Sequence, residues 1–158
     1  MTAEPATPSV RVSGIVKASP EAVWEAFMEP AALVEWLPPA QMTGVIHRFD
    51  ARVGGGYEMS LFYPPDERNF VGKTADREDR VIVRFVELEP PRRIVQAAAF
   101  QTTDPALFGE MRIVITLEAV AGGTEVAMTH ANLPPGVRPE DDEAGSRLSL
   151  LQLIRHFE

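Results

Sequence analysis

Three residues of the sequence could take part in acid–base chemistry or hold a polar group of a ligand. Tyr57 and Tyr63 fall in a stretch of alternating residues, which predicts a strand with both phenols on its inner face. Each phenol either orients a ligand or acts as an acid, or it is a core tyrosine with its hydroxyl at the rim. His130 falls beside Met128 on the inner face of another predicted strand. It either meets a ligand or acts as a general base, or it bonds a loop carbonyl at the strand end.

Metal and cofactor chemistry is not indicated by the remaining motifs. The sequence has no cysteine, and its histidines at 47, 130 and 156 do not have the H-x-H or H-E-x-x-H spacing of metal sites. The glycines at 54–56 precede a predicted strand and not a helix, so they do not form a phosphate loop. We predict no metal site, no cofactor and no catalytic residue.

Two of the histidines are predicted to lie away from any site. His156 falls off the apolar stripe of the last predicted helix and should face solvent. His47 is expected to be exposed or at a rim, although the register of its strand is ambiguous. The apolar residues of that strand allow two inner sets, which are Val45 with Phe49 or Met42 with Ile46.

Length and charge restrict the class of protein. A chain of 158 residues is the size of one domain, and it can bury a core without staples. Its net charge of -8 repels nucleic acid and anionic membranes. Because no apolar run begins the sequence, we expect no signal peptide or membrane span and a cytoplasmic location. We expect residues 1–8 to be disordered and residues 9–158 to form a single domain.

The patterning predicts an α+β domain with an antiparallel sheet and a long C-terminal helix. Two short helices should follow the first strand, with Ser19 and Pro20 opening the first of them. Leu150, Leu153 and Ile154 form the apolar stripe of the last helix, which should pack on the concave side of the sheet. The predicted strands are 9–17, 42–49, 55–63, 70–74, 80–88, 93–101, 109–120 and a last strand through His130, with a turn or bulge at 75–79 and helices to Met28, at 31–37 and from about Asp141.

The stretch from Asp50 to Tyr57 is predicted to be a glycine hinge between two strands. Three consecutive glycines permit a tight reversal with positive φ. Arg52 is expected to anchor this turn through Asp50 or a neighbouring carbonyl. The hinge should curve the sheet around the terminal helix.

The order of elements and four motifs resemble the START-like helix-grip (SRPBCC) superfamily. The motifs are S-P-E-A-V-W at 19–24, V-E-W-L at 34–37, D-x-R-x-G-G-x-Y at 50–57 and F-V-E-L-E-P-P-R-R-I-V at 85–95. Within it the chain is similar, over residues 9–158, to the C-terminal domain of the activator of the heat-shock protein 90 ATPase. The resemblance implies a curved sheet of about six or seven strands gripping the last helix. The family commonly has Gly-Trp where this chain has Gly145-Ser146, which implies either a wider pocket mouth or local repacking.

The resemblance implies a cavity between sheet and helix that holds a lipid, a polyketide or an aromatic molecule. An alternative is a protein-interaction domain with a chaperone as partner, and a weaker one is a cyclase or hydrolase acting in the cavity. We favour binding over enzymatic activity and expect a monomer or homodimer. The predicted ligand-binding residues are Phe27, Trp36, Tyr57, Met59, Leu61, Tyr63, Phe100, Met111, Ile113, Met128, His130, Leu150 and Leu153.

Overall fold

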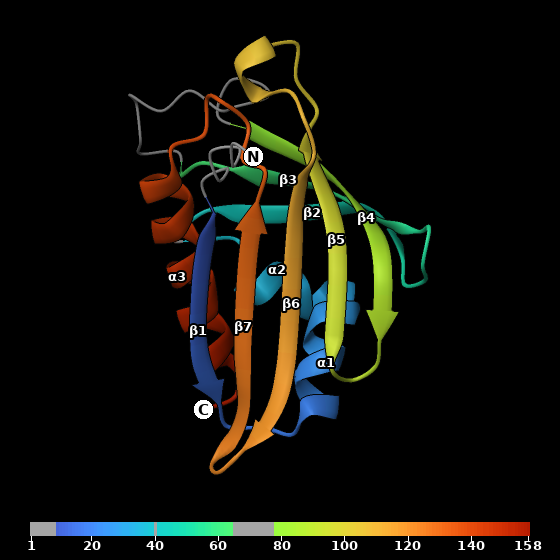
Figure 1. The fold of residues 1–158 in the computed structure, drawn as a ribbon, viewed down its shortest axis with the longest axis vertical. Coiled ribbons are helices and arrows are strands. Elements are labelled where there is room, and N and C mark those ends of the chain that lie inside the picture. The colour runs from blue at the N-terminus through green and yellow to red at the C-terminus, as the bar shows by residue number, and fades with distance from the viewer. Residues whose placement is uncertain (1–8, 40, 65–77) are drawn as a thin grey trace, which may run out of the picture.

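The protein folds as one curved antiparallel sheet that carries its helices on one side. In the computed structural model, which describes residues 9–39, 41–64 and 78–158, the chain forms seven strands and three α-helices (Figure 1). The strand order is β1-β7-β6-β5-β4-β3-β2, and each neighbouring pair is antiparallel. The elements are β1 (Val10–Val16), α1 (Pro20–Met28), α2 (Pro30–Trp36), β2 (Thr43–Asp50), β3 (Gly56–Phe62), β4 (Glu78–Glu89), β5 (Arg93–Phe100), the 3₁₀-helix η1 (Pro105–Leu107), β6 (Met111–Val120), β7 (Gly123–Ala131) and α3 (Pro139–His156).

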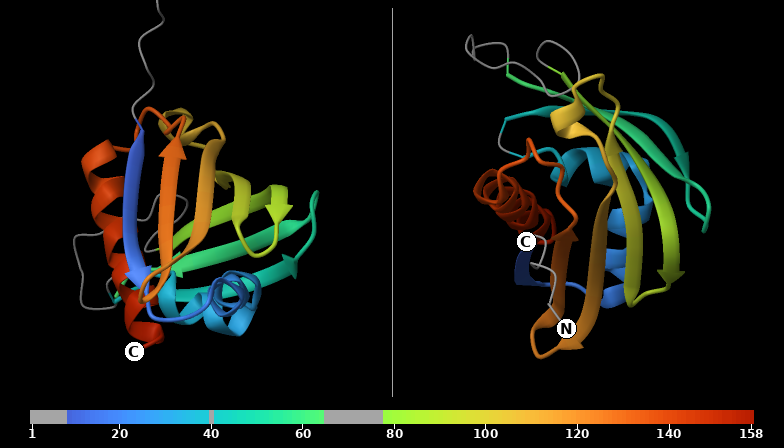
Figure 2. Two further views of the ribbon diagram at one scale, coloured as in Figure 1. Left: turned by 60° about the horizontal axis from the view of Figure 1, so that its bottom comes forward. Right: turned by 45° about the horizontal axis from the view of Figure 1, so that its top comes forward.

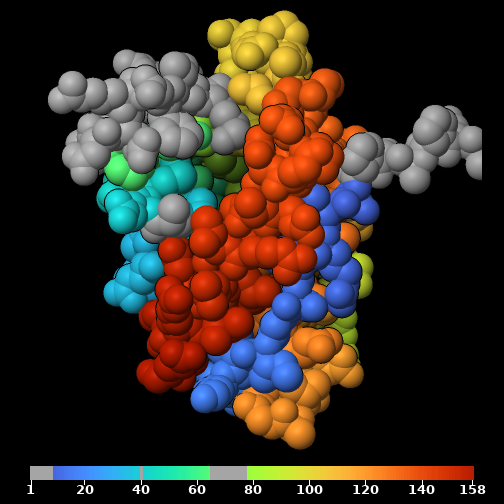
Figure 3. All heavy atoms as spheres, turned by 90° about the vertical axis from the view of Figure 1, so that its left-hand side faces the viewer, coloured from blue at the N-terminus to red at the C-terminus, as the bar shows by residue number. Residues whose placement is uncertain are grey.

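The sheet curves around the helices, as the α+β helix-grip prediction requires. Figure 2 shows all three helices on the concave side, with α3 running along β1. In the space-filling view, α3 lies between β1 on one side and α2 on the other (Figure 3). The predicted fold is therefore confirmed. No helix in the described part of the chain combines the length and the apolar character needed to cross a membrane.

The two short helices begin where the sequence predicts and pack on each other. Ser19 caps α1, because its hydroxyl accepts a hydrogen bond from the backbone N–H of Ala22 at 3.2 Å. The indole N–H of Trp36 in α2 donates to the carbonyl of Ala26 at 2.9 Å, and its ring meets Phe27 edge-on. Trp36 is 1% exposed, so this contact joins α1 and α2 inside the core.

The glycine hinge between β2 and β3 closes against β4. Gly54 and Gly56 have φ of +85° and +148°. A Cβ at Gly56 would lie 1.8 Å from the carbonyl oxygen of Val83, so only glycine allows this close approach. Arg52 donates to the carboxylate of Asp50 at 2.8 Å, which confirms the predicted anchor of the turn.

A bulge in β2 settles the ambiguous register of this strand. The pairing with β3 shifts between Ile46 and Arg48, so the alternation changes face at His47. Ile46 and Phe49 both pack against the core, whereas Val45 is 42% exposed. The inner residues are therefore Met42 and Ile46 of the second predicted set, and the bulge adds Phe49 of the first set.

Some predicted boundaries change and others fall outside the described residues. β4 begins at Glu78, so Glu78 and Asp79 belong to the strand and not to the turn or bulge predicted at 75–79. The predicted strand at 70–74 and the predicted disordered residues 1–8 lie outside the described residues. The segment between the strands predicted at 93–101 and 109–120 contains the short helix η1.

Candidate functional site

A cavity of about 920 Å³ lies between the concave face of the sheet and the helices. Small-molecule sites have volumes of about 300 to 1,000 Å³ with mostly apolar walls and a few polar groups. Most side chains on this wall are apolar, and they come from all three helices and from β3 to β7. The structure brings these predicted ligand-binding residues together on the wall: Phe27, Trp36, Tyr57, Met59, Leu61, Tyr63, Phe100, Met111, Ile113, Met128 and His130.

Two residues of the predicted set are placed elsewhere. Leu150 and Leu153 are buried, at 5% and 0% exposure, but they are not among the residues that line the cavity. Leu150 and Ile154 instead approach Gly14 of β1, where a Cβ would lie 3.4 and 3.1 Å from their methyl carbons. The apolar stripe of α3 therefore packs mainly on β1, and a different part of the helix faces the cavity.

Small residues of α3 complete the wall. Gly145, Ser146 and Ser149 line the cavity, and a Cβ at Gly145 would have no neighbour within 4 Å. The Ser149 hydroxyl donates to the carbonyl of Leu37 at 2.6 Å, which holds α3 against the end of α2. Gln152 reinforces this contact by donating to two backbone carbonyls near Leu37. The departure from Gly-Trp at Gly145-Ser146 was the sequence signal for this face, and Ser149 was not predicted.

Tyr57 provides a buried neutral phenol at the wall. The residue is 5% exposed, and its ring stacks on Phe49 with the centroids 5.5 Å apart. Burial raises the pKa of Tyr57 to about 12, and the hydrogen bond with the Gln96 side chain lowers it in part. The phenol therefore stays protonated at neutral pH. Gln96, which was not a predicted site residue, is 7% exposed and also lines the cavity.

A second phenol meets a buried carboxylate. The Tyr63 hydroxyl donates to Oδ2 of Asp79 at 2.8 Å. Asp79 is 3% exposed and lines the cavity together with Tyr63. The sequence analysis placed Asp79 in a turn or bulge before a strand, so this polar pair was missed.

His130 lies on the wall at the end of β7, facing α3. Its Nδ1 is 2.9 Å from Oδ2 of Asp142, and each side chain is 14% exposed. Both atoms are shielded from solvent, and neither has another hydrogen-bond partner among the described residues. Nδ1 therefore faces a carboxylate from the last helix and not the loop carbonyl of the alternative prediction.

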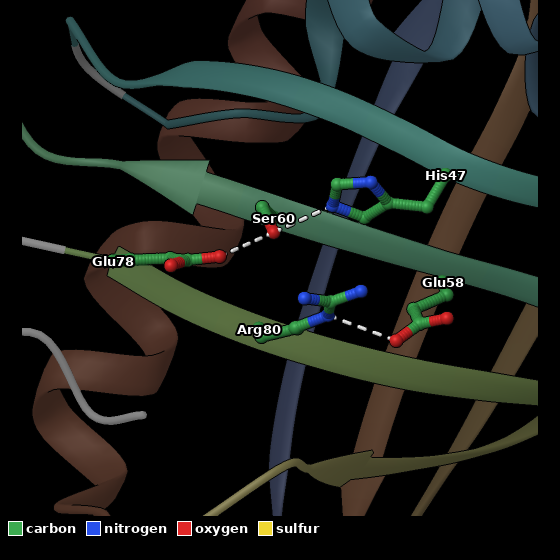
Figure 4. Close-up of polar contacts among 5 residues, drawn as sticks. All are labelled: His47, Glu58, Ser60, Glu78 and Arg80. Atoms are coloured by element: carbon green, nitrogen blue, oxygen red, sulfur yellow. Dashed lines mark hydrogen bonds and ion pairs between the residues drawn. The ribbon is translucent and has the colours of Figure 1, made fainter. Parts of the chain in front are cut away.

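His47 belongs to a polar cluster on the opposite face of the sheet. Figure 4 shows the Ser60 hydroxyl between His47 Nε2, at 2.8 Å, and the Glu78 carboxylate, at 2.5 Å, with the ion pair of Arg80 and Glu58 beside them. Ser60 is 0% exposed and donates to Glu78, so it is not placed as an accessible nucleophile.

His156 lies near Glu35, with 3.5 Å between Nδ1 and the carboxylate, and does not line the cavity. Within the described ranges, no group of three or more His, Asp or Glu residues could hold a metal ion.

Comparisons with known proteins give the family of this chain. Residues 17–158 match the family model described as Activator of Hsp90 ATPase homolog 1-like protein. Protein CV1439 from Chromobacterium violaceum is 31% identical, with a TM-score of 0.83 over 95% of this chain and 96% of that chain. Protein Ms6760 from Mycobacterium smegmatis, at 14% identity, shares the fold with a TM-score of 0.75 over 96% of this chain and 91% of that chain. No curated protein matches the chain. With the match covering nearly all of the described fold, the chain belongs to the Activator of Hsp90 ATPase homolog 1-like family.

Proposed function

We propose that this protein binds a small, largely apolar molecule in the cavity between its sheet and α3. The observation that carries the proposal is the cavity itself, with a volume of about 920 Å³ and a mostly apolar wall. This space is partly open to solvent, and its volume lies within the range of small-molecule sites. Polar groups on the wall occur as local pairs, Tyr57 with Gln96, Tyr63 with Asp79 and His130 with Asp142, among mostly apolar side chains, which suits orientation of a largely apolar ligand.

The wall is suited to ligands of more than one shape. Its methionines are unbranched and polarisable, so they adjust to irregular surfaces at low energetic cost. They come from α1, the segment before β2, and strands β3, β6 and β7. The methionines on the wall are Met28, Met42, Met59, Met111 and Met128.

Two neighbouring alanines of β5 allow a matched test of this proposal. Ala98 is 1% exposed and lines the cavity, whereas Ala99 lies beside it on the outer face of the sheet. The wild-type protein, Ala98→Phe and Ala99→Phe would each be titrated with the neutral dye N-phenyl-1-naphthylamine, and dye fluorescence would be measured. We expect saturable binding that Ala98→Phe weakens at least about tenfold, because the ring occupies the site, and that Ala99→Phe leaves unchanged.

The absence of saturable dye binding to the wild-type protein would contradict the proposal, and so would equal losses in both variants. A melting curve for each variant separates loss of the site from loss of the fold. The chaperone partner and the cyclase or hydrolase activity remain predictions from the resemblance.

A further inference from the structure

His130 and Asp142 form a histidine–carboxylate pair on the cavity wall. Nδ1 of His130, near the end of β7, lies 2.9 Å from Oδ2 of Asp142, in the first turn of α3. An ionised carboxylate only accepts hydrogen bonds, so the proton of the neutral imidazole belongs on Nδ1, beside Asp142. The pair therefore fixes the tautomer of His130 and leaves Nε2 as the basic nitrogen of the ring.

Nε2 of His130 is open at the same wall. The side chain lines the cavity and is 14% exposed. Within the described ranges Nε2 has no hydrogen-bond partner, and it is not shielded from solvent as Nδ1 is. A basic nitrogen at the wall of a ligand cavity is placed to take a proton from a molecule bound there.

The side chains around the pair favour proton transfer over acyl transfer. Acyl transfer through a covalent intermediate requires a nucleophile that is hydrogen-bonded to the base. Ser149 donates instead to the carbonyl of Leu37. Ser146 also lies on the wall, but among the described residues no hydrogen bond joins it to His130. Removal of a proton from carbon beside a carbonyl group needs a base and no nucleophile, and a mostly apolar wall suits an apolar ketone.

We infer that His130 is a general base that, positioned by Asp142, removes a proton from the carbon next to the carbonyl group of an apolar ketone bound in the cavity. The C–H bond breaks, its electron pair forms the enolate, and the proton goes to Nε2. The imidazolium that results is stabilised by Asp142 and offsets the charge of the enolate beside it. A proton then returns from Nε2 to carbon, either the original one or one exchanged with water, so no co-reactant is consumed.

This inference rests on the proposed function, because the ketone must bind in the cavity. The probe is 2-tetralone, an apolar ketone of two fused rings whose protons beside the carbonyl exchange with heavy water. Proton NMR would follow this exchange at pH 8 with the wild-type protein, His130→Gln and Asp142→Asn. His156→Gln is the matched control, because His156 also lies near a carboxylate, that of Glu35, but does not line the cavity.

We expect the wild-type protein and His156→Gln to catalyse exchange equally, and excess N-phenyl-1-naphthylamine to stop both. His130→Gln should lower kcat at least about 100-fold, because a positioned base contributes roughly 100- to 10,000-fold. Asp142→Asn should lower kcat at least about tenfold and change KM less than about twofold, because an amide can donate to Nδ1 and move the proton to Nε2. Asp142→Glu, which keeps a carboxylate, should retain more of kcat than Asp142→Asn.

Dye titration and a melting curve for each variant separate this inference from the proposed function. If the wild-type protein does not bind the dye, the proposed function fails and the inference fails with it. If the dye binds but the wild-type protein and His130→Gln exchange 2-tetralone at the same rate, the inference is overturned and the proposed function stands. Equal kcat in Asp142→Asn and the wild-type protein overturns the positioning role of Asp142. If His130→Gln does not fold, His130→Asn is measured in its place.

Discussion

The buried phenol of Tyr57 should make the stability of this protein fall steeply in alkaline solution. Burial raises the pKa of Tyr57 from 10.0 to about 12 in the folded protein. Below pH 10 both states keep the proton, and the full stability is present. As the pH rises from 10 toward 12, the unfolded chain loses the proton while the folded chain retains it, so the free energy of unfolding decreases. At about 1.36 kcal/mol for each pKa unit, this loss is roughly 2.3 kcal/mol at pH 12 and approaches roughly 2.7 kcal/mol only at higher pH.

Urea unfolding at a series of pH values measures this loss directly. Tyr57→Phe should be less stable at pH 8, by about 1 to 3 kcal/mol, because the buried Gln96 side chain loses its partner. The same variant should lose much less stability than the wild-type protein between pH 10 and pH 12. Tyr63→Phe serves as the control, because it leaves Tyr57 and Gln96 in place and should keep the alkaline decline. The reasoning is refuted if Tyr57→Phe and the wild-type protein decline equally.

Three further substitutions test how the fold holds the cavity. Gly56→Ala should cost more than about 2 kcal/mol of stability in urea unfolding, because its Cβ would collide with the carbonyl of Val83. Trp36→Phe should cost about 1 to 3 kcal/mol in the same assay, since the buried carbonyl of Ala26 loses its donor. Gln152→Ala removes the two Gln152 hydrogen bonds from α3 to the end of α2, leaving that of Ser149, and should increase amide hydrogen exchange in α3.

Each of these expectations has a clear opposite result. A stable Gly56→Ala protein would show that the hinge tolerates a displaced β4. Unchanged stability of Trp36→Phe would mean that the indole hydrogen bond contributes little. Hydrogen exchange in α3 that does not respond to Gln152→Ala would leave the packing on β1 as the main restraint of this helix.

The elements that the sequence predicts well are those specified by local chemistry. Ser19 and Pro20 mark a helix start because capping and a fixed φ act within one turn. The glycine hinge is recognisable because a close backbone approach such as that at Gly56 excludes other residues. Alternation identified the inner faces of β3, β6 and β7, so most of the predicted ligand-binding residues meet at one cavity.

The predictions that differ from the structure concern features that tertiary packing determines and the local sequence does not. An apolar stripe shows that α3 is buried on one side, but it does not say whether β1 or the cavity receives Leu150 and Leu153. A bulge such as that at His47 shifts the register without a marker in the sequence. Buried polar residues such as Asp79 and Gln96 were missed because alternation assigns polar residues to the solvent face.

Methyl NMR of the protein labelled at methionine and isoleucine tests the binding cavity most directly. Met59, Met111 and Ile113 lie on the cavity wall, whereas Ile15 and Ile82 are exposed elsewhere, at 49% and 38%. When N-phenyl-1-naphthylamine is added, the account predicts saturable ring-current shifts of the three cavity methyl signals and no change at Ile15 or Ile82. Cavity methyl signals that do not move at saturating dye, or shifts confined to the exposed isoleucines, would contradict a ligand site between the sheet and α3.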